Sequence, residues 1–264
     1  MGGPPAADGL NELLAIAEEA ARAAGALLVD RFESGQVGAV RMKSSRTDPV
    51  SESDTAAERT IRALLAERRP DDAVVGEEGA DQAGSSGMRW FVDPIDGTVN
   101  FVHGLPAWTV TLACQDASGT LAGVVYDPIR DEMFAATREG DATVNGVVIE
   151  VPRVASLDRA LVATGFGYDA ARRARQGEVA ARVLAAAADL RRIGSAAMDL
   201  AWTACGRMDA FYERGLNPWD AAAGALICER AGLSVRSLAP VEGLPDGLLA
   251  APEAIADDLE RLVG

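Results

Sequence analysis

The chain has 264 residues, enough for one large domain or two modest lobes around a sizeable core. Its hydrophobic content of 48% and its mixed composition are typical of a globular protein and exclude a disordered tail. The formal net charge of −15 makes the surface repel nucleic acids and anionic lipids over long range, so we expect neither as a partner. A small anionic substrate remains compatible with this charge if cations line its site.

The cysteines and the N-terminal residues bear on the compartment. The three cysteines are far apart and form no CxxC motif, so we expect buried reduced thiols rather than a disulfide framework or a zinc site. The opening segment MGGPPAADGL lacks the basic and apolar regions of a signal peptide. No apolar run is long enough to cross a membrane. These features predict a cytoplasmic protein.

Two helices are predicted first. Apolar residues recur at three- and four-residue steps over residues 8–33 and again over 53–68, which is the pattern of amphipathic helices. Ser53 is the expected N-cap of the second helix and Pro70 its stop.

Strands and turns dominate the next stretch. A short strand AVV precedes the turn GEEG at 76–79, and a strand RWFV follows at 89–92. Runs of β-forming residues separated by the turns ASG and DPIRDE predict a meander over 108–137. Asn145 and Gly146 mark one more tight turn.

From about residue 150 short strands alternate with helices, which is α/β character. The expected strands are ALVAT, LRRIG, MDAFYE, LSV and GLLAA, and the expected helices span about 170–188, 195–205, 218–231 and 252–263. We therefore place a boundary near residue 150, between an N-terminal α+β lobe (1–150) and a C-terminal α/β lobe (151–264).

The segment WFVDPIDGTVNF, residues 90–101, carries the strongest chemical signal. Asp93 and Asp96 stand three residues apart among apolar neighbours, so burial of at least one is expected. Two buried like charges are costly unless something neutralises them, and no Lys or Arg lies between Arg89 and Arg130. The pair therefore predicts a bound cation. Oxygen ligands without His or Cys favour Mg²⁺, Mn²⁺ or Ca²⁺ over zinc.

Four further acids lie beside turns or helix starts, where functional side chains often occur. They are Asp48, Glu77, Glu78 and Asp220. Taken singly, each also has a structural interpretation: Asp48 precedes Pro49 in a turn, the two glutamates can form a solvated loop, and Asp220 suits the first turn of a helix.

Gly97 and Thr98 directly follow the acidic pair. A glycine lets backbone N–H groups approach an anion, and Thr98 adds a hydroxyl. Carboxylates for metal beside donors for phosphate predict a metal-dependent phosphoryl site, with one metal activating water and another stabilising the leaving oxygen. A non-catalytic Ca²⁺- or carbohydrate-binding module would explain the acids but not the adjacent Gly97 and Thr98.

Three segments, GEEG, DPIDGTVNFVHGLP and NPWDAAAGALICERAGL, resemble the signature segments of the inositol monophosphatases, which are Mg²⁺-dependent, lithium-sensitive phosphatases. The resemblance covers nearly the whole chain, and RRIGSAAMDLA and GRMDAFYE look most like the bacterial branch. It implies an α/β (α+β) fold, the αβαβα layered sandwich of the inositol monophosphatase and fructose-1,6-bisphosphatase type. It also implies a homodimer and two or three Mg²⁺ per site.

The resemblance also implies roles by position. The matching metal ligands are Glu77, Asp93, the backbone oxygen of Ile95, Asp96 and Asp220. The matching phosphate-binding residues are Gly97 and Thr98. The matching catalytic residues are Glu77 together with Asp48 and Thr98, the pair that orients the attacking water. The matching substrate contacts are Gly194, Ser195, Ala196 and Glu213.

The expected reaction is hydrolysis of inositol monophosphate to myo-inositol and phosphate. The same chemistry on histidinol phosphate, fructose 1,6-bisphosphate or a 3′-phosphoadenosine nucleotide remains open, because the metal site reads only the phosphate. Histidinol phosphate carries a cation, and a second acid near Glu213 would favour it. A third alternative is an interaction protein of the transcription machinery, which the charge of −15 disfavours.

Overall fold

The computed structural model describes residues 7–42 and 49–264 of the chain. In chain order the helices are α1 (Ala7–Glu33), α2 (Glu52–Arg68), α3 (Thr98–Val102), α4 (Ala170–Ala186), α5 (Ala196–Ala204), α6 (Pro218–Arg230) and α7 (Glu253–Val263), with a 3₁₀ turn η1 (Leu157–Arg159). No helix in this described part of the chain is long and apolar enough to cross a membrane.

The larger sheet has seven strands. Their order in the sheet follows the chain: β3 (Ala73–Gly76), β4 (Arg89–Asp96), β5 (Thr109–Asp116), β6 (Gly119–Asp127), β7 (Glu132–Thr137), β8 (Thr143–Val144) and β9 (Val147–Val148). Only β3 and β4 pair in parallel, and the remaining pairs are antiparallel, as the expected meander requires. Asn145 and Gly146 both have positive φ in the turn between β8 and β9.

The smaller sheet has five strands. Their spatial order is β11 (Asp189–Arg191), β10 (Leu161–Thr164), β12 (Ala210–Arg214), β14 (Gly247–Ala251) and β13 (Ser234–Leu238). The first three run parallel, and β14 is antiparallel to both of its neighbours. A separate two-stranded ribbon pairs β1 (Val40–Met42) with β2 (Pro49–Ser51).

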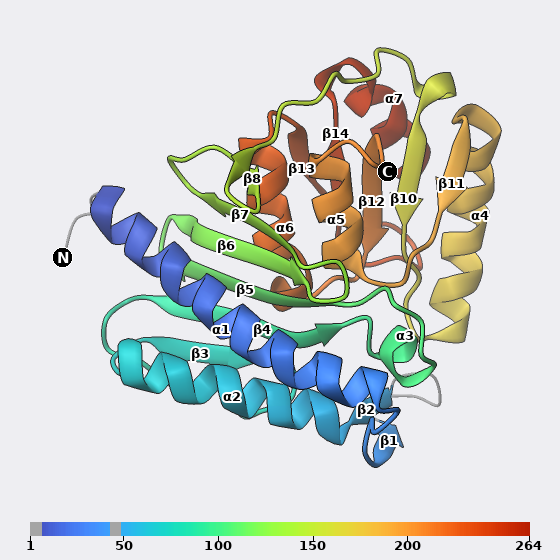
Figure 1. Ribbon diagram of the computed structural model, residues 1–264. Helices are drawn as coiled ribbons and strands as arrows, with labels where there is room; N and C mark the ends of the chain where they lie inside the picture. The colour runs from blue at the N-terminus through green and yellow to red at the C-terminus, as the bar shows by residue number, and fades with distance from the viewer. Residues whose placement is uncertain (1–6, 43–48) are drawn as a thin grey trace.

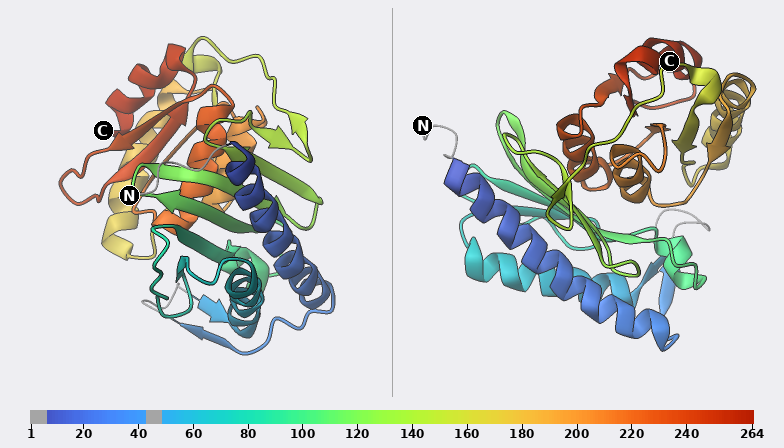
Figure 2. Two further views of the ribbon diagram at one scale, coloured as in Figure 1. Left: turned by 90° about the vertical axis from the view of Figure 1, so that its left-hand side faces the viewer. Right: turned by 45° about the horizontal axis from the view of Figure 1, so that its top comes forward.

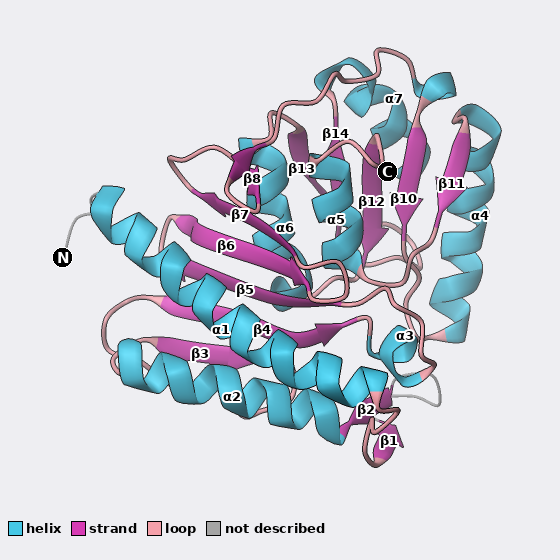
Figure 3. Ribbon diagram, viewed as in Figure 1, coloured by secondary structure: helices cyan, strands magenta, loops and turns pink. Residues whose placement is uncertain are grey.

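Helices and sheets alternate in layers (Figures 1 and 3). Helices α1 and α2 cover one face of the larger sheet, α5 and α6 lie between the two sheets, and α4 and α7 cover the outer face of the smaller sheet (Figure 2). This αβαβα arrangement confirms the expected layered sandwich. The middle core joins Phe134 of the larger sheet to Phe211 of the smaller one, so the sheets share one apolar layer.

Local sequence explains most element bounds, with two corrections. The cap of α2 is Ser51, not the expected Ser53: the Ser51 hydroxyl accepts from the Asp54 N–H, and the Asp54 carboxylate accepts from the Ser51 N–H. The strand expected at 190–194 is shorter, 189–191, because the chain turns at Gly194, where φ is +103°.

Candidate active site

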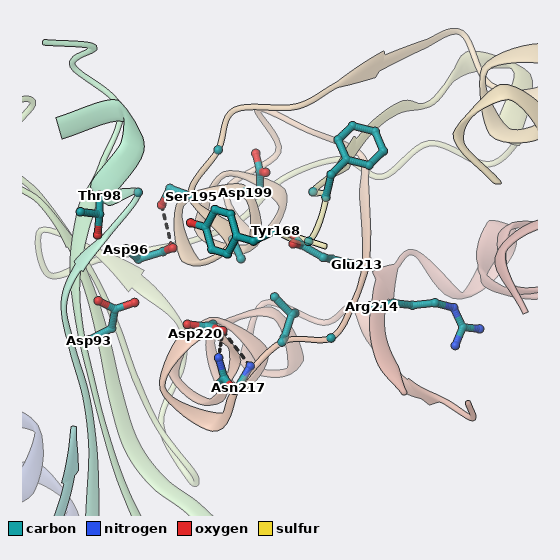
Figure 4. A pocket seen from close by; sticks show the side chains of 18 of the residues that line it. Asp93, Asp96, Thr98, Tyr168, Ser195, Asp199, Glu213, Arg214, Asn217 and Asp220 are labelled. Carbon is teal, nitrogen blue, oxygen red and sulfur yellow. Dashed lines mark hydrogen bonds between the residues drawn. The ribbon is translucent and has the colours of Figure 1, made fainter. Parts of the chain in front are cut away.

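A cavity of about 370 Å³ lies where the end of β4 faces the N-terminal ends of α5 and α6. Helix N-termini carry partial positive charge and favour an anion. All the expected site residues in the described part of the chain line it: Glu77, Asp93, Ile95, Asp96, Gly97, Thr98, Gly194, Ser195, Ala196, Glu213 and Asp220. Figure 4 shows the acids of β4 and α6 on one side and Glu213 beyond them. Asp48 lies outside the described residues.

A bulge in β4 turns the acidic motif toward the cavity. The pairing of β4 with β5 shifts register between Asp93 and Asp96, around a proline that has no N–H for the ladder. Gly97 then adopts φ +105°, and a Cβ there would lie 3.1 Å from the Ala107 oxygen and 3.3 Å from the Ser195 Cβ. Only glycine suits this position, so the following N–H groups can approach an anion.

The hydroxyl of Thr98 has a partner that sequence reasoning missed. Thr98 Oγ1 lies 2.9 Å from Asp54 Oδ1 and 3.0 Å from the Ile95 backbone oxygen. Asp54 is fully buried, and its other oxygen accepts from the N–H and the hydroxyl of Ser51. Burial raises the pKa of Asp54, and Glu77 adds to the rise. The serine-to-aspartate spacing of a capping box in SESD was the available signal, but it pointed only to a helix start.

The acids of the cavity repel one another. Burial is the main cause that raises the pKa of Asp93 far above its usual range, with Glu77, Asp96 and Asp220 adding to it. Burial likewise raises the pKa of Asp96 to about 6 and that of Asp220 to about 8. Within the described ranges no arginine forms an ion pair with any of these three aspartates.

The donor set fits a hard divalent cation. It consists of carboxylate oxygens and one backbone oxygen, with no His or Cys, and its mutual repulsion would be relieved by a bound positive charge. Among the described residues, no three acidic, His or Cys side chains already converge as ligands of one ion. The side chains that could hold it are partly engaged with protein donors: Asp220 Oδ2 accepts from the Asn217 N–H at 2.7 Å.

Ser195 has a structural task in addition to lining the cavity. Its hydroxyl donates to Asp96 Oδ2 at 2.7 Å and accepts from the Met198 N–H, so it caps α5 and joins that helix to β4. The Ala197 N–H donates to the same Asp96 oxygen at 2.6 Å. These bonds lower the pKa of Asp96 and partly offset the effect of its burial.

The far end of the cavity holds two more acids, the partly buried Glu213 and the buried Asp199. Burial raises the pKa of Glu213 to about 8, with Asp96 and Asp220 adding to the rise and Arg192 opposing it. A Cβ on Gly165 would lie 2.1 Å from Glu213 Oε2, so this glycine leaves room for the carboxylate. Asp199 of α5 is 1% exposed, and its Oδ1 has no hydrogen-bond partner among the described residues. Burial and then Glu213 raise the pKa of Asp199 well above its usual range.

Tyr168 also lines the cavity, and no sequence pattern singles it out. The residue is 41% exposed, and in Figure 4 the ring extends into the space between Asp96 and Glu213. The loop that carries it leads into α4, whose N-cap is Asp169.

The chain is similar to known proteins over most of its length. Residues 9–259 match the model of the Inositol monophosphatase family. "Inositol-1-monophosphatase SuhB" of Mycobacterium tuberculosis is 45% identical over 233 residues, which cover 84% of this chain and 80% of that protein. "Nus factor SuhB" of Pseudomonas aeruginosa is 40% identical over 235 residues, covering 84% of each chain. The crystal structure of extragenic suppressor protein suhB from Bartonella henselae superposes with a TM-score of 0.88 at 35% identity, covering 96% of this chain and 98% of that one. With the family match spanning almost the whole chain and its acids meeting in one cavity, the chain belongs to the inositol monophosphatase family and is a metal-dependent phosphatase.

Proposed function

We propose that the protein hydrolyses inositol monophosphate to myo-inositol and phosphate with Mg²⁺ as cofactor. The observation that carries this proposal is one cavity with the acids of β4 and α6 at one end and Glu213, an acceptor for ring hydroxyls, at the other. The 45% identity to a protein named inositol-1-monophosphatase supports the same substrate.

Mg²⁺, when bound, supplies positive charge that activates water and stabilises the leaving oxygen. We expect two or three ions per site. The residues that would hold them are Glu77, Asp93, the backbone oxygen of Ile95, Asp96 and Asp220. The charges of Asp93 and Asp220 at pH 7 depend on this occupancy, because burial alone favours the protonated forms of these two acids.

The chain's own residues would hold the phosphate and orient the water. Gly97 exposes backbone donors to a phosphate oxygen. The Thr98 hydroxyl has two acceptors in reach, Asp54 Oδ1 and the Ile95 backbone oxygen. When it donates to Asp54, its lone pairs are free to accept a hydrogen bond from the attacking water. We therefore propose Asp54 as the partner of Thr98 in the role first expected of Asp48. Glu213 would form hydrogen bonds with hydroxyl groups of the alcohol.

Histidinol phosphate is a second candidate substrate, and Asp199 is the observation that favours it. A second acid near Glu213 would suit the cation of this substrate. Burial and Glu213 raise the pKa of Asp199, and a positive charge bound beside it would favour its ionised form. Arg192 argues against a cationic substrate, because its positive charge lies near both acids and lowers the pKa of each. The same cavity therefore contains features for a neutral polyol and for a cationic alcohol.

Phosphate release, with and without Mg²⁺, should be measured in parallel from inositol 1-phosphate and histidinol phosphate. Strong Mg²⁺-dependent release from the inositol ester is the expected result. A higher kcat/KM for histidinol phosphate would keep the site and replace the substrate. If the folded protein released phosphate from neither ester, the proposal would be contradicted and bisphosphate substrates should be tested next.

We also propose a cytoplasmic homodimer inhibited by lithium, on the family resemblance. The name of the Pseudomonas relative raises a transcriptional role, and the net charge of −15 argues against direct nucleic-acid contact in such a role. Stoichiometric co-purification of a polymerase would support it.

A further inference from the structure

The turn that carries Glu77 is tied to a buried carboxylate outside the cavity. Glu58 of α2 is 2% exposed and does not line the cavity. Its Oε2 accepts from the Glu78 N–H at 2.8 Å, and its Oε1 accepts from the Gly79 N–H at 2.9 Å. One carboxylate therefore accepts hydrogen bonds from two successive N–H groups of the GEEG turn.

The two glycines of this turn are explained by Glu58 and not by backbone conformation. Neither Gly76 nor Gly79 has a positive φ. A Cβ on Gly76 would lie 2.4 Å from Glu58 Oε1, and a Cβ on Gly79 would lie 2.6 Å from the same atom. Any larger residue at either position would displace the carboxylate, so the GEEG pattern matches the space that Glu58 occupies.

Arg62 fixes the orientation of this carboxylate. Its Nε donates to Glu58 Oε1 at 2.6 Å, one helical turn further along α2, and its side chain is only 18% exposed. A hydrogen bond between charged groups in a mostly buried place is stronger than a neutral one. The Glu58 carboxylate is thus bonded to Arg62 of its own helix and to two N–H groups of the turn.

Glu77 lies between two anchors. Its own N–H donates to the Val92 oxygen of β4 at 3.1 Å, and the next two N–H groups donate to Glu58. Three successive donors are therefore fixed, the first by the sheet and the others by α2. We propose that Glu58 is a positioning residue that sets the Glu77 carboxylate for the divalent cation. The inference rests on the proposed function, which makes Glu77 a ligand.

The size of the expected effect is taken from other metalloproteins, in which residues that position a metal ligand have been substituted. Their substitution typically costs about 10- to 100-fold in metal affinity or activity. Glu58→Gln keeps the size of the side chain but leaves one acceptor oxygen, so an amide NH₂ group would face one of the two N–H donors. We expect the turn to shift and the cation to bind more weakly.

Mg²⁺ binding to purified Glu58→Gln should be measured without substrate by calorimetry and by the Mg²⁺-induced rise in Tm. We expect the Mg²⁺ Kd to rise by about 10-fold or more, and the half-saturating Mg²⁺ concentration in the phosphatase assay to rise in parallel. At saturating Mg²⁺ the KM for inositol 1-phosphate should stay close to that of the wild type. Glu67→Gln, an exposed position on the same helix, is the matched control and should bind Mg²⁺ like the wild type.

A folded Glu58→Gln variant with wild-type Mg²⁺ affinity would overturn the inference. Gly79→Ala is a second variant, which displaces the Glu58 carboxylate without removing it. It should weaken Mg²⁺ binding as Glu58→Gln does. If either variant lowers only the Tm, Glu58 has a structural role alone. Wild-type protein that neither binds Mg²⁺ nor releases phosphate would instead refute the proposed function.

Discussion

Asp54 and Thr98 are 44 residues apart in the chain, and their side chains meet at 2.9 Å beside the cavity. Both are buried, and Asp54 is held in turn by Ser51 at the start of α2. The Ile95 backbone oxygen is a second acceptor, 3.0 Å from the same hydroxyl. A hydroxyl that donates to Asp54 presents its lone pairs elsewhere, and the cavity is where an attacking water would need them.

We therefore expect Asp54→Asn to lower kcat by about 10²- to 10³-fold with little change in KM, because loss of a positioned proton acceptor acts mainly on the chemical step. An asparagine can also donate toward Thr98 and reverse its hydroxyl. Thr98→Ser should retain most activity, and Thr98→Val should lose it. Steady-state kinetics on the three variants checks this. Equal activity in Thr98→Ser and Thr98→Val would show that the hydroxyl plays no part.

Asp93→Asn should have opposite effects on activity and on metal-free stability. The variant removes a proposed ligand while keeping its shape, so activity should fall to background. It also removes a buried carboxyl group whose ionisation is opposed by burial and by the neighbouring acids, so without metal the Tm should rise. Assays with Mg²⁺ and melting curves in a chelator test both. Asp81→Asn, at an exposed position, should change neither. Wild-type turnover by Asp93→Asn would refute the ligand assignment.

Sequence patterns predicted most of the elements and the family resemblance implied the layers, but neither showed which buried groups meet. Apolar spacing predicted α1 over nearly its full length, and turn residues predicted the meander of the larger sheet. Asp48 and Asp54 are only six residues apart in one polar stretch, and nothing local distinguishes them. The choice of Asp54 depends on where the start of α2 packs against α3, a long-range contact that periodicity does not encode.

The same limit applies to Ser195 and Asp199. Ser195 was expected as a substrate contact, while its hydroxyl caps α5 and binds Asp96 from another sheet. In the sequence Asp199 resembles an ordinary acid in the first turn of a helix. Its burial beside Glu213 follows from the packing of α5 against β12.

Asp199→Asn is expected to change substrate preference. It removes a carboxyl group that can ionise when a cationic alcohol binds beside it and keeps the side-chain volume, so a cationic alcohol should lose more affinity than a neutral polyol. We expect the ratio of kcat/KM for histidinol phosphate to that for inositol 1-phosphate to fall by about tenfold, on the order of 1.4 kcal/mol. Asp141→Asn, at an exposed position that does not line the cavity, is the control. An unchanged ratio would show that Asp199 does not contribute to the choice between the two alcohols.

The pH dependence of stability tests the buried state of Glu213. Its folded pKa is raised to about 8 from 4.5, so the folded protein binds this proton more tightly than the unfolded chain does. The stability that the proton contributes is complete below pH 4.5 and is lost as the pH rises through about 8. Each tenfold difference in proton affinity between the folded and unfolded states corresponds to about 1.4 kcal/mol in the free energy of unfolding.

Metal-free wild-type protein should therefore lose free energy of unfolding between pH 5 and pH 8.5. In Glu213→Gln the side chain stays neutral at every pH, so the slope over this window should be shallower, while the contributions of Asp96 and Asp220 remain. Urea unfolding in a chelator at several pH values measures both slopes. Identical slopes in the two proteins would mean that Glu213 titrates near its ordinary pKa, and that water rather than protein surrounds the far end of the cavity.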